Sequence, residues 1–197
     1  MHIPSSALCA LGIFSAALFL AHGAVNGTRE DAQAALCMTR MRDLGTAFRN
    51  YAADHEDQLP LAADRTRNPW RWWYDAIFSY VPSVSLFYCP VKLEKSSPAM
   101  RSPLLPVTWN VALLSYGITH PIYQYQQSGR VLRFRDVGDG SKVLLGESNF
   151  GILRNTRHYW FKDIAPRHRG EAHFLLFDGS VIAEGNLTAD FPYDGGP

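Results

Sequence analysis

A hairpin signal near the C-terminus constrains the fold of this 197-residue chain more than any other feature. The dipeptide Asp178-Gly179 separates two short apolar runs. Asp-Gly in such a setting is typical of a tight type I′ turn between antiparallel strands, because that turn needs two residues that tolerate positive φ. We therefore expect a β-hairpin here, with strands near 173–177 and 180–184, and a third strand near 142–146 in the same sheet.

A second pattern predicts a long helix nearer the N-terminus. Mostly apolar residues recur at spacings of three and four, which places them on one face of a helix. This stripe consists of Cys37, Met41, Leu44, Phe48, Tyr51 and His55. We expect Thr28 to cap the start of the helix and Pro60 to mark its end, since proline cannot continue a helix.

The segment 1–27 permits two interpretations. An apolar run without charged side chains fills most of it, and its length suits a membrane helix of roughly 18 or more residues. The alternative is a secretory signal that is cleaved before Ala24, after the small residues Ala21 and Gly23. We favour the membrane anchor, and either interpretation predicts that the remaining chain is exported.

Cysteine usage agrees with an exported domain. Cys37 and Cys89 lie outside the apolar run, and a cysteine pair in an oxidising compartment is a candidate disulfide. The bridge would close a loop of about 50 residues and stabilise the fold by roughly 4 kcal/mol. Two buried free thiols are the alternative.

His168 stands ten positions before Asp178, which gives the pattern H-x9-DG. This pattern resembles the signature of a family of bacterial pseudopilin-like envelope proteins, which is related to the G-type pseudopilins of type II secretion. The stretch around Asp139-Gly140, which runs on to Glu147, is similar to its second Asp-Gly element. Further matches are Arg29-Glu30, Leu44-Gly45, Asn50-Tyr51, Leu59-Pro60 and Ser115-Tyr116-Gly117.

The resemblance implies an α+β, pilin-like fold. A long N-terminal helix, in which a membrane anchor continues into an amphipathic helix, would pack on an antiparallel β-sheet. The implied organisation is an anchor or signal segment at 1–27, a pseudopilin-like domain at 28–189 and a flexible tail at 190–197. The prepilin peptidase site is degenerate, because Met1-His2 stands at the cut and Ser6 occupies the position of a glutamate in the family.

The implied function is non-enzymatic. We expect a structural or scaffolding protein at the cell surface or in a secretion or pilus-like assembly, with other envelope or pilin-like proteins as partners. The implied location is the cell envelope, as a single-pass inner-membrane protein with an exported domain; a secreted or periplasmic protein is the alternative. Nineteen basic and eighteen acidic side chains nearly cancel, so we expect no nucleic-acid partner.

His168 and Asp178 also permit a chemical interpretation. Together they would serve as a general base pair or as metal ligands, with His173 as a third ligand in a metal-dependent hydrolase. Turn chemistry gives Asp178 a local role instead, since a turn aspartate commonly accepts hydrogen bonds from nearby backbone N–H groups. We favour this structural role, so we expect no catalytic residue and no metal site.

Two further expectations concern acidic residues. Glu147 follows the strand near 142–146, and we expect its carboxylate to pair with Arg167 or His168. G-type pseudopilins carry a calcium site, so the resemblance makes calcium the one cofactor to consider, with ordinary turn and surface acids as the alternative. The candidate ligands are Asp139, Glu147, Asp178, Asp190 and Asp194.

An aromatic segment at 68–90 is expected to be strand-like. Its tryptophans, together with one further along the chain, are candidates for binding a glycan or a partner protein. These residues are Trp70, Trp72, Trp73 and Trp160. Packing against the helix stripe, in the core or at an interface, is the alternative that we favour.

Overall fold

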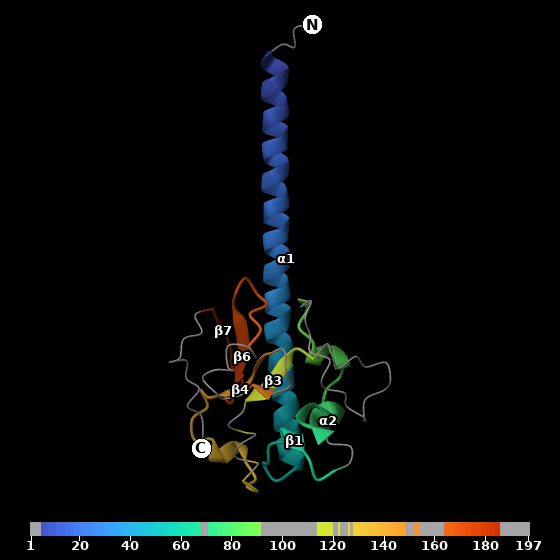
Figure 1. Ribbon diagram of the computed structural model, residues 1–197, viewed down its shortest axis with the longest axis vertical. Helices are drawn as coiled ribbons and strands as arrows, with labels where there is room; N and C mark the ends of the chain where they lie inside the picture. Colours follow the sequence, from blue (N-terminus) through green and yellow to red (C-terminus); the bar gives the residue numbers. More distant parts are fainter. Residues whose placement is uncertain are drawn as a thin grey trace.

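The computed structural model describes residues 5–67, 71–91, 114–119, 122, 126, 128–148, 152–153 and 164–185, with the backbone alone for 5–26 and 152. The fold is α+β, as expected: one long N-terminal helix packs on a sheet (Figure 1). The helix crosses the body of the protein and extends well beyond it toward the N-terminus (Figure 1).

Helix α1, Ser5–Asp54, is continuous over 50 residues. The expected start at Thr28 is wrong, because the helix runs through this position without a break. Its end comes before Pro60, since Glu56 and Asp57 adopt positive φ angles of 54° and 66°. The N–H of Asp57 donates to the carbonyl oxygen of Ala52 at 2.8 Å, which closes the last turn in the manner of a left-handed cap.

The predicted stripe forms the buried face of α1. Cys37, Met41, Leu44 and Phe48 are fully buried, and Tyr51 is half-buried. His55 is the exception: it is exposed and stacks on the Tyr51 ring, with 4.0 Å between the centroids. The helix pattern therefore holds for four turns and ends where the helix itself ends.

The main sheet has five strands in the order β5-β3-β4-β6-β7. Their bounds are Tyr116–Thr119 (β3), Val143–Glu147 (β4), Ile152–Leu153 (β5), Ala172–Leu176 (β6) and Val181–Glu184 (β7). Neighbouring strands are antiparallel except for the pair of β3 with the edge strand β5, which is parallel. The three strands that the sequence predicted are thus present within one or two residues of their expected bounds.

The two faces of this sheet have different neighbours. Tyr116, Ile118, Leu145 and Leu175 belong to the core that contains the α1 stripe. A second, smaller core covers the opposite face with Val143, Leu153, Ile164, Ala172, Phe174 and Leu176. Alternate residues of a strand point to opposite faces, so Glu147 in β4 and His173 in β6 fall on the side of α1, beside Leu145 and Leu175.

The hairpin between β6 and β7 forms at Asp178-Gly179, but its turn type differs from the expected one. Gly179 has a φ of 94°, whereas Asp178 is not among the described residues with positive φ. Gly179 N–H donates to the Leu176 oxygen at 3.0 Å, and Leu176 N–H donates to the Ser180 oxygen at 2.9 Å. This pattern is a three-residue loop closed by a left-handed glycine, so the type I′ expectation was wrong.

The segment 68–90 was expected to be strand-like, and this is largely wrong for its described part. Only β2, Arg71–Trp72, is a strand, and it pairs with β1, Ala63–Asp64. The rest forms helix α2, Trp73–Ile77, and the 3-10 turns η1, Phe78–Tyr80, and η2, Val84–Phe87. A further 3-10 turn, η4, spans Phe134–Asp136. Aromatic content alone indicated strands, but the rings of Trp73, Tyr74 and Phe87 instead lie in the core beside α1.

The expected single-pass membrane location is also overturned. Within the described part of the chain, no helix is both long enough and apolar enough to cross a bilayer.

Candidate functional site

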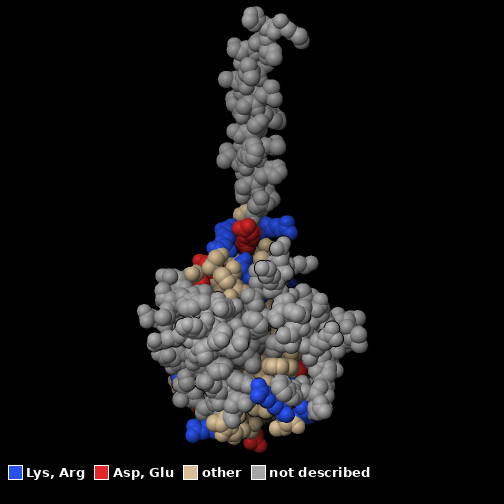
Figure 2. Space-filling view, in the orientation of Figure 1, with Lys and Arg blue, Asp and Glu red and all other residues tan. Residues whose placement is uncertain are grey.

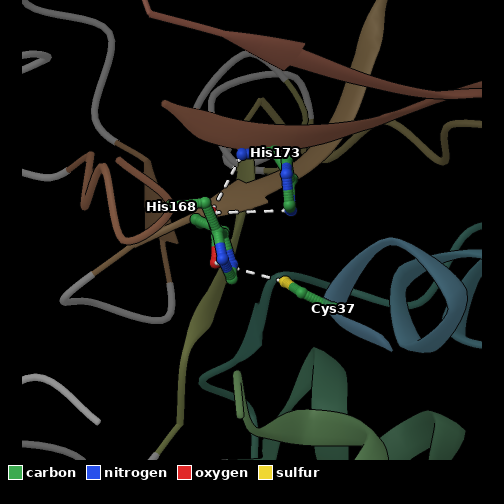
Figure 3. Close-up of side chains that lie close together, drawn as sticks. Cys37, His168 and His173 are labelled. Atoms are coloured by element: carbon green, nitrogen blue, oxygen red, sulfur yellow. Dashed lines mark hydrogen bonds and ion pairs between the residues drawn. The ribbon is translucent and has the colours of Figure 1, made fainter. Parts of the chain in front are cut away.

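Five side chains that carry chemistry meet between α1 and the sheet. They come from α1, from the segment after η2, from β4, from the turn before β6 and from β6 itself. They are Cys37, Cys89, Glu147, His168 and His173. Each is at most 7% exposed, and Figure 3 shows Cys37 pointing from the helix toward the two histidines. We call this group the buried polar cluster.

Strand pairing and a tight turn bring these side chains together. Glu147 is the last residue of β4 and lies opposite Tyr116 of β3. His168 is fixed by the turn at Arg169-Gly170, where both residues have positive φ, 53° and 88°. Two backbone hydrogen bonds between His168 and Glu171, at 3.1 and 2.9 Å, close this turn. The two-residue turn that the sequence placed at the Asp-Gly pair is therefore found here.

The carboxylate of Glu147 is the centre of the cluster. Its Oε1 accepts a hydrogen bond from Cys37 Sγ at 3.2 Å and lies 3.2 Å from His168 Nε2. Its Oε2 accepts the backbone N–H of His173 at 2.9 Å. The guanidinium of Arg167, also buried, lies 3.9 Å from Oε1. The predicted pairing of Glu147 with Arg167 or His168 is confirmed, with both partners present.

The histidines contact each other and a second thiol. Their rings stack with centroids 4.3 Å apart and planes 12° from parallel. Cys89 Sγ lies 3.3 Å from His168 Nε2. The Nδ1 atoms of both histidines are buried and have no hydrogen-bond partner among the described residues, and that of His173 lies 3.9 Å from Glu147 Oε2. Burial of a polar atom without a partner is energetically unfavourable, so these two ring nitrogens are candidates for binding a ligand.

Burial and neighbouring charges shift the pKa values in opposite directions. Burial raises the pKa of the Glu147 carboxyl, but the hydrogen bond and charge of His168, with the charge of Arg167, bring it below its usual value. Burial lowers the pKa of His168, yet its contacts with Cys89 and Glu147 outweigh this and raise it to about 9. Burial lowers the pKa of His173. Near neutral pH the cluster therefore contains an anionic Glu147 beside a cationic His168 and a neutral His173.

The structure brings the two candidate disulfide residues together as free thiols. Cys37 and Cys89 are both buried, and a hydrogen bond between them lowers the pKa of Cys89 and raises that of Cys37. Cys37 also lies 3.3 Å from the hydroxyl of Tyr116. The two thiols are in contact without a bond between them, so the disulfide stays a prediction.

The two ends of the H-x9-DG motif do not meet. His168 belongs to the buried polar cluster, whereas Asp178 is exposed in the hairpin loop. The carboxylate of Asp178 accepts the N–H of Ser180 at 2.8 Å, which is the local role expected from turn chemistry. The hydrolase arrangement needed His168, Asp178 and His173 to converge, and only the two histidines do so.

Among the described acidic residues considered for calcium, Glu147 lies apart from Asp139 and Asp178. Asp139 and Asp178 lie in exposed turns, and Glu147 lies in the buried polar cluster. The two Asp-Gly elements touch through their backbones, since Asp178 N–H donates to the Gly140 oxygen at 2.9 Å. Asp190, Asp194 and the tail 190–197 lie outside the described residues.

Two of the four candidate tryptophans are described. Trp73 is fully buried and stacks on Phe48 of α1, with centroids 5.5 Å apart. It cannot bind a ligand at the surface, so its candidacy was wrong and the favoured core-packing alternative holds for it. Trp72 is half-buried beside a surface pocket, and Trp70 and Trp160 lie outside the described residues.

The sequence pointed to all five members of the cluster but not to their convergence. It assigned Cys37 and Cys89 to a disulfide, offered His168 as a partner of Glu147, and gave His173 a place in the alternative hydrolase site. The contact of Cys89 with His168 and that of Tyr116 with Cys37 were not predicted. One signal was available. His173 lies two positions before Leu175 on one strand, and Cys37 starts the apolar stripe, so His173 and Cys37 were both expected to face the core between helix and sheet.

Comparisons with protein-family models, with curated proteins and with solved structures find no match to this chain.

Proposed function

We propose that this protein is a non-enzymatic, pseudopilin-like structural subunit that assembles with further copies or with pilin-like partners through the N-terminal part of α1. The observation that carries this proposal is the length of α1 relative to the body. The helix has 50 residues, and among its positions with described side chains, from Gly27 onward, the first buried one is Cys37. Its N-terminal half extends away from the body (Figure 1).

A projecting apolar helix needs a neighbour. A helix outside a folded body gains little from intrinsic propensity and depends on packing of an apolar face. The sequence of the projecting part is apolar, with no charged residue before Arg29. Lateral packing with other such helices is the contact that would stabilise this segment.

The buried polar cluster supports a structural role for the body. Its side chains are at most 7% exposed and link α1 to β4 and β6. A substrate would need access to these groups, whereas hydrogen bonds that hold the helix on the sheet are stronger when they are enclosed. A structural subunit benefits from such contacts, because they fix its helix relative to its body.

The proposal is tested by the assembly state of the full chain. Sedimentation velocity and electron microscopy of the purified protein should show discrete oligomers or filaments. Leu18→Asp, which places a charge in the apolar segment, should dissociate them, whereas Thr46→Asp on an exposed position of the same helix should not. A monomeric wild-type chain, or assembly that Leu18→Asp leaves unchanged, would contradict the proposal.

A surface pocket favours one other candidate function, a glycan- or protein-binding module. The pocket measures about 290 Å³ and combines the aromatic groups of Tyr51 and Trp72 with the polar groups of Asp64, Arg67 and Asp75. An aromatic wall with nearby hydrogen-bonding groups suits a sugar ring. Titration of simple sugars, followed by tryptophan fluorescence in wild-type and Trp72→Ala protein, tests it. If the fluorescence change on sugar addition is the same in the two proteins, this candidate is removed.

A further inference from the structure

We propose that the buried polar cluster is a zinc-type metal site, with Cys37, Glu147, His168 and His173 as its ligands. One ligand atom from each of the four lies within 4.8 Å of the others. This assignment goes beyond the structural role proposed above and does not depend on assembly through α1. No metal site was expected from the sequence.

The distances suit a tetrahedral ion after small side-chain movements. The usual Zn–S, Zn–N and Zn–O bond lengths place neighbouring ligand atoms roughly 3.3 to 3.8 Å apart. Glu147 Oε1 lies 3.2 Å from both Cys37 Sγ and His168 Nε2. The Nδ1 atom of His173 lies 3.9 Å from the other carboxylate oxygen. These separations are close to those between neighbouring ligand atoms around one ion, and a turn of the stacked histidine rings would complete the site.

The unpartnered nitrogen of His173 is an independent sign of a ligand. Its side chain is 2% exposed, and within the part of the chain that the structure describes its Nδ1 atom has no hydrogen-bond partner. The ring nevertheless lies parallel to that of His168 and faces the carboxylate. A bound cation would use this lone pair, because a neutral imidazole nitrogen is a common metal ligand.

The donor set selects the kind of metal. One thiolate, two imidazoles and one carboxylate form a mixed S, N and O set, which suits zinc and related transition metals rather than calcium. Two anionic ligands offset the two charges of the ion, so that burial of the complex does not leave a large net charge. Four protein ligands fill a tetrahedral site, which is typical of structural rather than catalytic zinc.

A surface pocket borders the cluster at His168. A pocket of about 370 Å³ is lined by Arg167 and His168 and by the acids Glu30, Asp31 and Glu171. Figure 2 shows charged groups gathered where α1 leaves the body, and the described residues there include Glu30, Asp31 and Arg169. Arg169 also lines this pocket and pairs with Glu30 and Asp31, so the charges at its mouth largely balance.

Cys89 limits the metal site to the reduced form of the protein. Its sulfur contacts both Cys37 and His168, so it borders the ligand set. A disulfide between Cys37 and Cys89 would remove a thiolate ligand from the site. Metal binding and the disulfide are therefore mutually exclusive states of the same residues.

The test uses the full chain, stripped of metal with a chelator in the presence of a reductant, and then titrated with Zn²⁺ or Co²⁺. Elemental analysis should give one zinc per chain. Cobalt should produce the visible bands of a tetrahedral site and a thiolate-to-cobalt charge-transfer band. His173→Gln and Cys37→Ser should weaken binding by at least about 100-fold, above the 10- to 100-fold loss seen for outer-shell partners, and Cys37→Ser should also remove the charge-transfer band.

His55→Gln is the matched control, since His55 is an exposed histidine on the same helix as Cys37. It should leave zinc affinity unchanged. Failure of the folded wild-type chain to retain stoichiometric zinc would overturn the proposal. So would a cobalt spectrum without thiolate ligation, which is read on the wild type and does not depend on whether a variant folds.

Discussion

Replacement of Glu147 by glutamine gives the most direct test of the buried polar cluster in its metal-free form. The substitution keeps the shape of the side chain but removes its charge. In the wild type one carboxylate oxygen contacts Cys37 and His168 and the other accepts the backbone N–H of His173. An amide can present its oxygen to only one of these sides, so donors on the other side would face an NH₂ group.

The expected loss follows from these contacts. A hydrogen bond to a charged group contributes about 1.5–3 kcal/mol, and removal of one member of a buried ion pair typically costs about 3–5 kcal/mol. Arg167, at 3.9 Å, would also lose its nearest buried counter-charge. We therefore expect Glu147→Gln to lower the free energy of unfolding by about 3–5 kcal/mol, which corresponds to a fall in melting temperature of about 10 °C for a domain of this size.

Urea unfolding, followed by circular dichroism with chelator and reductant present, measures this difference. Glu171→Gln is the control, because Glu171 is an exposed carboxylate close to the same turn, and it should change stability by less than about 0.5 kcal/mol. Because the pKa of Glu147 is lowered in the fold, its stabilisation is present above the ordinary glutamate pKa and is lost as the pH falls through the lowered value. An unchanged stability of Glu147→Gln at neutral pH would refute the role given to this carboxylate.

Three further substitutions test the packing around the site. Gly146→Ala should destabilise the fold by about 1–3 kcal/mol, because a methyl group there would lie 2.7 Å from a Leu153 methyl carbon and 2.8 Å from the Phe174 ring; urea unfolding that matches the wild type would contradict this. Gly179→Ala should cost about 1–2 kcal/mol, since its φ is 94°; thermal unfolding measures it. Trp73→Ala should cost about 3–5 kcal/mol, and equal losses for Trp73→Ala and Trp72→Ala in urea would contradict the deep burial of Trp73.

The parts of the fold that were predictable are those set by local periodicity. Residues at spacings of three and four identified the buried face of α1, and the two short apolar runs around Asp178-Gly179 identified β6 and β7. The turn type was not predictable from the dipeptide, because it depends on register. Leu175 pairs with Val181, which leaves room for a three-residue loop rather than a two-residue type I′ turn.

The cluster itself could not be derived from the sequence, because its members are far apart along the chain. Cys37 and Glu147 are 110 positions apart, and no short motif connects them. The number of residues between two positions does not determine the angle between a helix and a sheet. The approach of Cys37 to His168 therefore depends on how α1 is placed on the sheet. Close contact at Gly45, where an added methyl group would lie 3.1 Å from Leu175, shows how tightly the helix is seated.

The nine residues between His168 and Asp178 now have a physical explanation. The turn at Arg169-Gly170 reverses the chain after His168. Strand β6 then runs for five residues, and the chain reverses again in the loop that contains Asp178-Gly179. One residue more or fewer in β6 would move His173 and Leu175 to the opposite face of the sheet, because side chains alternate along a strand. The spacing therefore serves two separate ends: it places both histidines beside Glu147 on the side of α1, and it places the aspartate in a turn where no partner from the cluster is needed.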